Sequence, residues 1–235
     1  HFYAVKAESG KVAWTFPVRT ETLSLPRVVG GVVYFLNGAD IAYALDAKSG
    51  KQIWVYNRQT SNTLSIRAGS QPLVVGNQVL IGFSDGFLVS LRVNDGGLIW
   101  EKKLSKNERF KDIDASPVAD GGSVYVASYD GSTFSIDPAN GNINWQFEDG
   151  AYVPVTIDSE HLFLSTSTGR VICLDRISGK EVWRYQLKNG IPTQVSTSKG
   201  YVTFGESDGA LVVLDAQSGK YVGKYEPGHG IQSRP

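Results

Sequence analysis

Short runs of alternating apolar and polar residues follow one another along the chain, separated by glycine, asparagine and aspartate. Residues 23–54 show the pattern: LSLP, a Gly-Gly turn, VVYFL, an Asn-Gly turn, IAYALD, a Ser-Gly turn and QIWVY. No stretch keeps the i, i+3, i+4 spacing of an amphipathic helix over three turns, whereas alternation with a period of two is typical of half-buried strands. The segment therefore predicts four short strands in an antiparallel meander.

The same four-strand pattern returns with a period near 40 residues. It is most visible in the runs SVYVASYDGSTFSID, HLFLSTSTGRVICLD and YVTFGESDGALVVLD. Radial repetition of such sheets makes a β-propeller, which leaves few open sheet edges. We therefore expect an all-β protein, a β-propeller of four-stranded antiparallel blades, with about five complete blades over residues 23–225. Residues 1–235 are expected to form a single propeller domain.

A tryptophan stands four residues after a glycine in five of six repeats. The marker glycines, spaced by 40, 46, 45, 38 and 40 residues, are Gly10, Gly50, Gly96, Gly141, Gly179 and Gly219. The tryptophans are Trp14, Trp54, Trp100, Trp145 and Trp183, and Gly223 replaces the sixth. One large ring at the same strand position predicts a structural contact between adjacent blades, with all but Trp14 largely buried. The glycines suit turns with positive φ, and the aspartates four residues before them, Asp46, Asp137, Asp175 and Asp215, suit Asx turns.

The two ends of the chain fall inside repeats. His1 leads directly into FYAVK, a run of the third-strand type, and residues 231–235 belong to a run of the first-strand type. The complete blades are thus flanked by the third and fourth strands of one more blade and the beginning of another. We expect the chain to be incomplete at both ends and to be a piece of a longer propeller.

Composition argues against several classes of function. Lys plus Arg and Asp plus Glu both number 23, so no basic excess recommends nucleic acid. His1, His161 and His229 are far apart, and none has a second ligand at zinc-site spacing. Catalytic and nucleotide-binding motifs are absent, and no apolar run is long enough for a transmembrane segment. We expect no metal, no cofactor and no catalysis.

The single cysteine, Cys173, stands where other repeats carry small residues and is predicted to be a core residue rather than a reactive thiol.

Two adjacent connections between blades are longer than the others. The distance from tryptophan to the proline of the next first strand is 18 and 17 residues for these two, against 12, 9 and 9 elsewhere. Insertions on one rim of a propeller often mark a binding face. The first connection carries Leu64, Ile66 and Arg67, and the second carries Asp112 and Asp114. Apolar anchors beside an arginine and two carboxylates predict a protein-binding site, and the alternative is a solvated loop with a local salt bridge.

The repeated phrase A-x-D-x-x-[ST]-G-K-x-x-W resembles the tryptophan-docking repeat of the PQQ-like propellers, and this resemblance covers essentially the whole chain. Within that superfamily, LSIRAGSQP and DIDASP are similar to two loop motifs of the BamB family, although Ile66 replaces a leucine and Ala68-Gly69 replace Gly-Glu. The segment GIQSRP resembles the family's seventh repeat. The resemblance implies that the chain corresponds to roughly the second through seventh repeats of an eight-bladed ring.

The resemblance also implies a function. BamB proteins are non-enzymatic lipoprotein scaffolds of the β-barrel assembly machinery, at the periplasmic side of the outer membrane, anchored through an N-terminal cysteine that this chain lacks. Their loops engage the POTRA domains of the central assembly subunit, and this role maps onto Leu64, Ile66, Arg67, Asp112 and Asp114. Nascent outer-membrane proteins are a further implied partner.

Two other classes share this repeat. A quinoprotein dehydrogenase needs a quinone stacked between a tryptophan and an adjacent-cysteine disulfide, with Ca²⁺ beside a catalytic aspartate. The chain has only Cys173, although some quinone enzymes lack that disulfide. The third interpretation is a propeller that binds other proteins or polysaccharides. Bound quinone with Ca²⁺ is the observation that favours the enzyme, and a pull-down from solubilised outer membrane separates the assembly scaffold from a general binding propeller.

Overall fold

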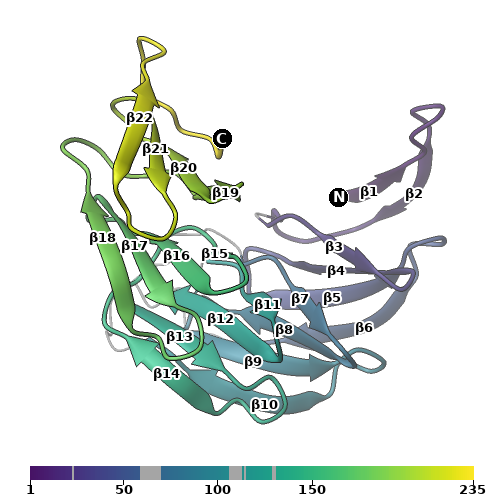
Figure 1. Ribbon diagram of the computed structural model, residues 1–235. Helices are drawn as coiled ribbons and strands as arrows, with labels where there is room; N and C mark the ends of the chain where they lie inside the picture. Colours follow the sequence, from purple (N-terminus) through teal and green to yellow (C-terminus); the bar gives the residue numbers. More distant parts are fainter. Residues whose placement is uncertain (23, 59–69, 106–112, 114, 129–130) are drawn as a thin grey trace. The chain divides into compact units, whose positions relative to one another are not determined.

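The computed structural model describes residues 1–22, 24–58, 70–105, 113, 115–128 and 131–235. This part of the chain contains β-strands and no helix. The strands form five four-stranded antiparallel sheets and one two-stranded sheet (Figure 1). Each four-stranded sheet follows chain order, which confirms the predicted meander. Contacts group the residues into two compact units, residues 1–117 with 138–141 and residues 118–137 with 142–235. The four-stranded sheets are called blades below.

The first unit contains the two-stranded sheet and two blades. Its strands are β1 Phe2–Val5, β2 Val12–Phe16, β3 Arg27–Val29, β4 Val32–Leu36, β5 Ile41–Asp46, β6 Gln52–Asn57, β7 Leu73–Val75, β8 Gln78–Gly82, β9 Phe87–Arg92 and β10 Leu98–Lys103. The β1–β2 pair has the sequence of third and fourth blade strands and covers the next blade with aromatic rings. Phe2 stacks on Phe35 with ring centroids 4.5 Å apart, and Phe16 meets Tyr43 edge-on.

The second unit contains three blades. Its strands are β11 Val118–Asp120, β12 Ser123–Ser128, β13 Ser132–Ile136, β14 Ile143–Phe147, β15 Thr156–Ile157, β16 His161–Ser165, β17 Arg170–Asp175, β18 Glu181–Gln186, β19 Ser196–Ser198, β20 Tyr201–Gly205, β21 Leu211–Asp215 and β22 Tyr221–Tyr225. Cys173 lies in the core between the last two blades, and burial raises the pKa of its thiol to about 12. Because the thiolate is the reactive form, this cysteine behaves as a core residue.

Burial within a blade follows the order of its strands. The second and third strands, such as β4 and β5, are buried on both faces, whereas the fourth strand, such as β6, alternates between exposed and covered residues. The pairing of third and fourth strands shifts register beside the tryptophan, for example between Ala44 and Leu45. A bulge of this kind re-aims a side chain, here the indole ring toward the following repeat.

The five tryptophans make one contact in five copies. Each ring lies on the marker glycine of the next repeat, where an added Cβ would come within 2.5–2.8 Å of a ring atom. Each indole Nε1 also donates to the carbonyl three residues before that glycine, at 2.8–3.1 Å. The pairs are Trp14 with Ala47, Trp54 with Val93, Trp100 with Pro138, Trp145 with Arg176 and Trp183 with Ala216. These glycines have φ of 67–74°, so the position requires both a left-handed backbone and the absence of a side chain.

The exposure of these rings differs in part from the expectation. Trp54 and Trp183 are buried, with 5% and 8% of their surface exposed. Trp100 and Trp145 are only half-buried, so the expectation that these two rings are largely buried is wrong. Their contacts with the next repeat are the same.

The aspartates before the marker glycines cap the turns. Oδ1 of Asp46 accepts from the amide and the hydroxyl of Ser49 at 2.7 and 2.6 Å, and Asp175 and Asp215 make the same pair of bonds with Ser178 and Ser218. Hydrogen bonds to the ionised form lower the pKa of each of these three carboxyls. The predicted Asx role therefore holds for these three positions.

Candidate functional site

The five residues predicted to bind a partner, Leu64, Ile66, Arg67, Asp112 and Asp114, lie outside the described residues. The structure does describe where the two long connections that carry them begin and end. The first connection leaves β6 at Asn57 and enters β7 at Leu73. The second leaves β10 at Lys103 and enters β11 at Val118. The geometry at these ends shows how the two connections are held.

Arg58, the first residue after β6, ties the start of one connection to the strand that leads into the other. Its Nε donates to Oδ2 of Asp85 at 2.5 Å, and its Nη1 donates to Oε2 of Glu101 in β10 at 2.7 Å. The guanidinium also lies over the rings of Phe87 and Phe83, 4.4 and 5.6 Å from their centroids. Only 11% of the Arg58 side chain is exposed.

Arg58 is a partly buried cation whose charge is compensated by hydrogen bonds to neighbouring carboxylates. Burial alone would lower the pKa of the guanidinium, but the hydrogen bonds to Glu101 and Asp85 outweigh it and the pKa is raised. Two carboxylates and two aromatic faces therefore compensate for the loss of water around the cation.

The far ends of the two connections also meet. The amide of Gln71 donates to Oγ of Ser116 at 2.8 Å, which joins the end of the first connection to the end of the second. The side chain of Gln71 donates in turn to the carbonyl of Pro26, and Arg27 reaches the carbonyl of Pro72. The predicted neighbourhood of the two connections is thus shown for their described ends.

Ile113 anchors the second connection. It is 1% exposed, and a Cβ added to Gly82, the last residue of β8, would lie 2.6 Å from its Cγ2. In the sequence, Ile113 lies between Asp112 and Asp114, the two residues predicted to bind a partner, and it is itself buried in the core. Buried Ala115 and Leu104 continue this anchoring on either side.

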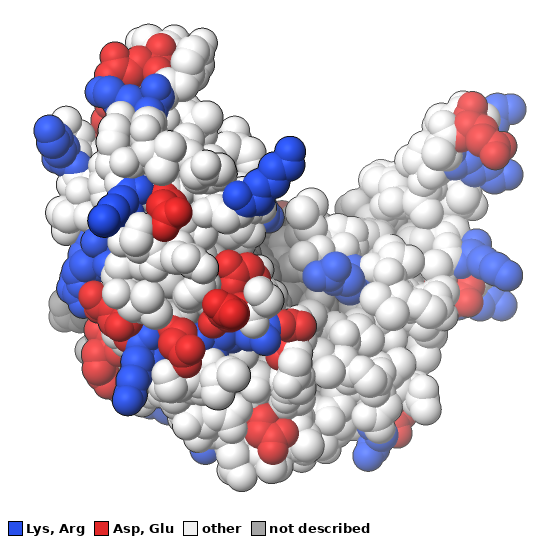
Figure 2. Space-filling view, in the orientation of Figure 1, with Lys and Arg blue, Asp and Glu red and all other residues white. Residues whose placement is uncertain are grey.

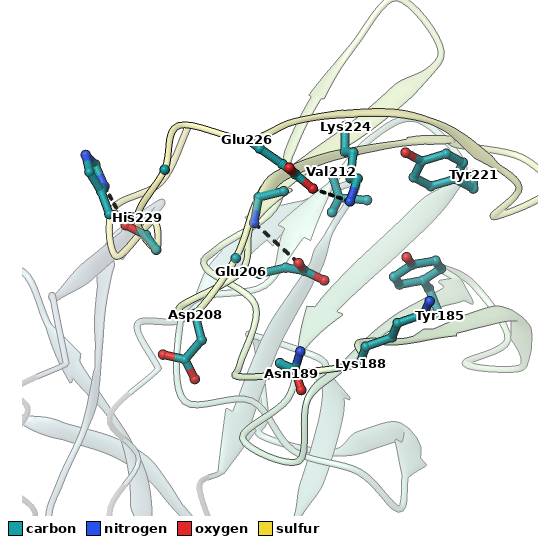
Figure 3. A pocket seen from close by; sticks show the side chains of 14 residues that line it. Tyr185, Lys188, Asn189, Glu206, Asp208, Val212, Tyr221, Lys224, Glu226 and His229 are labelled. Atoms are coloured by element: carbon teal, nitrogen blue, oxygen red, sulfur yellow. Dashed lines mark hydrogen bonds and ion pairs between the residues drawn. The ribbon is translucent and has the colours of Figure 1, made fainter.

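A second candidate site is a groove in the second unit, between blade β15–β18 and blade β19–β22 (Figure 3). Its volume is about 670 Å³, within the roughly 300–1,000 Å³ of ligand pockets. Tyr185 and Val212 form apolar walls, and Tyr221 lies at the same end as Tyr185. Glu206 and Asp208, from the turn between β20 and β21, contribute carboxylates.

Elsewhere the charged groups are mixed in sign. Lys and Arg alternate with Asp and Glu over the face shown in Figure 2, without a large area of one sign. Among the described residues, no group of three or more His, Cys, Asp or Glu is arranged to hold a metal ion. No helix of membrane-spanning length and hydropathy occurs in the same residues.

Sequence reasoning missed both Arg58 and the groove. Arg58 was overlooked because it comes before the inserted part of its connection, where no motif draws attention to it. The groove was detectable by comparing hairpins: residues 82–91 read GFSDGFLVSL and residues 205–214 read GESDGALVVL. The two aromatic positions of the first become glutamate and alanine in the second, which opens space between blades.

Comparison with known proteins agrees with the fold. A solved structure, BamB from Moraxella catarrhalis, superposes with a TM-score of 0.87 at 24% identity, covering 98% of this chain and 72% of that one. The quinohemoprotein alcohol dehydrogenase of Comamonas testosteroni gives a TM-score of 0.73 at 16% identity over 88% of this chain and 43% of its own. At such identities these likenesses establish the propeller fold and nothing further.

Sequence comparison identifies the family. The outer membrane protein assembly factor BamB of Yersinia pestis is 32% identical over 187 residues, which is 77% of this chain and 47% of that protein. The chain thus spans about half the length of such relatives. The family described as outer membrane protein assembly factor BamB matches residues 1–185. The chain belongs to the BamB family of PQQ-like β-propellers.

Proposed function

We propose that this chain is part of a non-enzymatic scaffold subunit of the machinery that assembles β-barrel proteins in the outer membrane, at its periplasmic side. Its membership of the BamB family, whose members are named outer membrane protein assembly factors, supports this role. A lipid anchor on an N-terminal cysteine is part of this proposal. A reading frame with a signal peptide that ends in a lipid-modified cysteine is the result expected there.

The two long connections form the proposed docking surface for POTRA domains of the central assembly subunit. The observation that carries this proposal is the pair of contacts that joins them, Arg58 with Glu101 at one end and Gln71 with Ser116 at the other. Fixing the ends of a connection lowers the entropy that is lost when a partner binds to it. We assign Leu64 and Ile66 as apolar anchors, and Arg67, Asp112 and Asp114 as the charged contacts.

The test is the affinity of the chain for a purified array of POTRA domains, measured by calorimetry. We expect Arg67→Ala, and Asp112→Ala combined with Asp114→Ala, to weaken binding by about 1.5–4 kcal/mol, because truncation leaves partner charges unpaired. The melting temperature of the free chain should change little, since both changes fall in connections rather than in blades.

The matched control is Arg92→Ala. This arginine is half-exposed and pairs with Asp95 in the turn between β9 and β10, at the opposite end of the strands from the long connections. It should leave POTRA binding unchanged. The proposal fails if the connection variants bind as tightly as the parent chain, or if they lose binding only because they unfold.

A further inference from the structure

The two hairpins compared above, residues 82–91 and 205–214, occupy equivalent positions at two different interfaces between blades. The aspartate is shared, as Asp85 and Asp208, and the outer strand supplies Glu101 in one blade and Lys224 in the other, paired with Val89 and Val212 respectively. The two differences that change the space are Phe83 to Glu206 and Phe87 to Ala210.

The preceding blades are equivalent in the same way. Arg58 and Leu187 each follow a fourth strand four residues after its tryptophan. Their amides donate to corresponding hairpin carbonyls, Arg58 to Asp40 at 3.2 Å and Leu187 to Gly169 at 2.9 Å. At the first interface, an arginine of the chain itself lies over two aromatic rings and pairs with Asp85. At the second, Leu187 is buried in the core, and the groove of about 670 Å³ takes up the corresponding space.

The polar groups of the groove are only partly satisfied within the chain. Asp208 is exposed, and its carboxylate makes no hydrogen bond or ion pair with any described residue, whereas its equivalent Asp85 binds Arg58. Among the described residues, the hydrogen bond that the Glu206 carboxylate accepts is a long one, 3.4 Å, from the amide of Ala210. Lys224 is engaged by Glu226, as the dashed line in Figure 3 shows. The carboxylates at the groove, Glu206, Asp208 and Glu226, outnumber its two lysines, Lys188 and Lys224, and Lys224 interacts with Glu226 and with Glu206.

The turn that carries Glu206 and Asp208 is held rigidly. The amide of Ser207 donates to the carbonyl of Ile191 at 2.9 Å, and the amide of Ile231 donates to the carbonyl of Glu206 at 2.9 Å. A Cβ on Gly230 would overlap the carbonyl of Ser207. The connections before and after the blade thus clamp the turn from both sides, which preorganises the two carboxylates for a ligand.

We propose that this groove binds an arginine side chain presented by a short segment of a partner polypeptide. The guanidinium would pair with Asp208 and Glu206, as Arg58 pairs with Asp85, and Tyr185 with Tyr221, which lie at the other end of the groove from Asp208 (Figure 3), would contact apolar parts of the same segment. The volume exceeds that of one side chain, so adjoining backbone has room. This inference is independent of the POTRA-docking proposal, because it concerns different residues in the other unit.

The experiment titrates the chain with acetyl-Ala-Arg-Ala-amide and follows binding by calorimetry. The comparison peptide replaces arginine with citrulline, which has nearly the same shape but no charge. We expect the citrulline peptide to bind at least about tenfold more weakly, since charge-assisted hydrogen bonds are lost. Free L-arginine should also bind more weakly than the peptide, because it adds a carboxylate to a groove that already carries several and has no adjoining backbone to contact it. This comparison needs no variant and decides the question even where a variant misfolds.

The variants locate the site. Asp208→Asn and Glu206→Gln should each weaken the arginine peptide by about tenfold, and Ala210→Phe, which restores the ring found at Phe87, should block the groove. The control is Glu8→Gln, an exposed carboxylate in the β1–β2 turn, which should change nothing. The proposal is overturned if the arginine peptide does not bind at millimolar concentration, if citrulline or free arginine binds equally well, if Asp208→Asn and Glu206→Gln are without effect, or if inorganic phosphate competes for the groove.

Discussion

The guanidinium of Arg58 shows how a single residue can replace hydrophobic packing between blades. It lies between β6 and the hairpin of the next blade. Asp85, Glu101 and two aromatic rings compensate for the water that its charge loses there. Leu187 occupies the equivalent place at the other interface and points into the core instead. The same backbone therefore tolerates a buried cation or an apolar side chain, depending on which residues face it.

Arg58→Leu tests this balance. Asp85 would be left without its cation in a partly buried place, and we expect a loss of about 2 kcal/mol in the free energy of unfolding, less than for a fully buried pair because Glu101 is 41% exposed. Urea unfolding followed by tryptophan fluorescence measures it. Arg92→Leu removes an exposed pair and should stay within about 0.5 kcal/mol of the parent. Equal costs for the two variants would show that the Arg58 contacts are not stabilising.

At the scale of elements, the marker glycine adopts a positive φ and also leaves room for the docking indole. The two requirements can be separated within one blade. Gly219 has φ of 67° and lies under the ring of Trp183, whereas Gly200, with φ of 80°, has nothing within 4 Å of an added Cβ. Gly200→Ala should cost about 1 kcal/mol for the backbone alone. Gly219→Ala should cost at least about 3 kcal/mol, because its methyl group also displaces the indole.

Thermal and urea unfolding of the two variants give the comparison, and Trp183→Ala provides the reference for complete loss of the docking contact. If the two alanine variants are equally stable, the glycine is required only for its φ. In that case the close approach of ring and glycine contributes nothing to the docking of one blade on the next.

The strands and their turns were predictable because both depend on local patterns, alternation with period two and residues that suit a turn. The carbonyl that each indole would reach, such as Ala216 for Trp183, was not predictable, since it belongs to the next repeat and depends on how blades approach. The groove could be found from the sequence only by comparing one hairpin with another. Glu206 and Ala210 look like ordinary turn residues until they are set beside Phe83 and Phe87 in the other hairpin.

For the whole molecule, stability is built from the same contacts repeated. Each docking ring joins a blade only to the next repeat in the chain, so stability is approximately a sum of intrinsic and neighbour terms, as in other repeat architectures. The Asp–Ser turns repeat in the same way at Asp46, Asp175 and Asp215. Small terms at equivalent turns can therefore add to an effect that is measurable for the chain as a whole.

The last prediction concerns acid. The serine hydrogen bonds lower the pKa of Asp46, Asp175 and Asp215 below the ordinary value of 3.8. A carboxyl with a depressed folded-state pKa adds stability above its unfolded-state pKa, and this is lost as the pH falls through the folded-state value. We therefore expect the urea midpoint to be nearly constant from pH 7 to 5 and to fall below about pH 4.

Replacing all three aspartates with asparagine keeps an acceptor oxygen at each turn and removes its titration. The triple variant should be less stable than the parent at pH 7, where the ionised acceptors are stronger, and its midpoint should fall less steeply below pH 4. Replacing Ser49, Ser178 and Ser218 with alanine removes the main cause of the lowered pKa and should flatten the curve in the same direction. Parallel curves for the parent and both triple variants would place the acid sensitivity at other carboxylates.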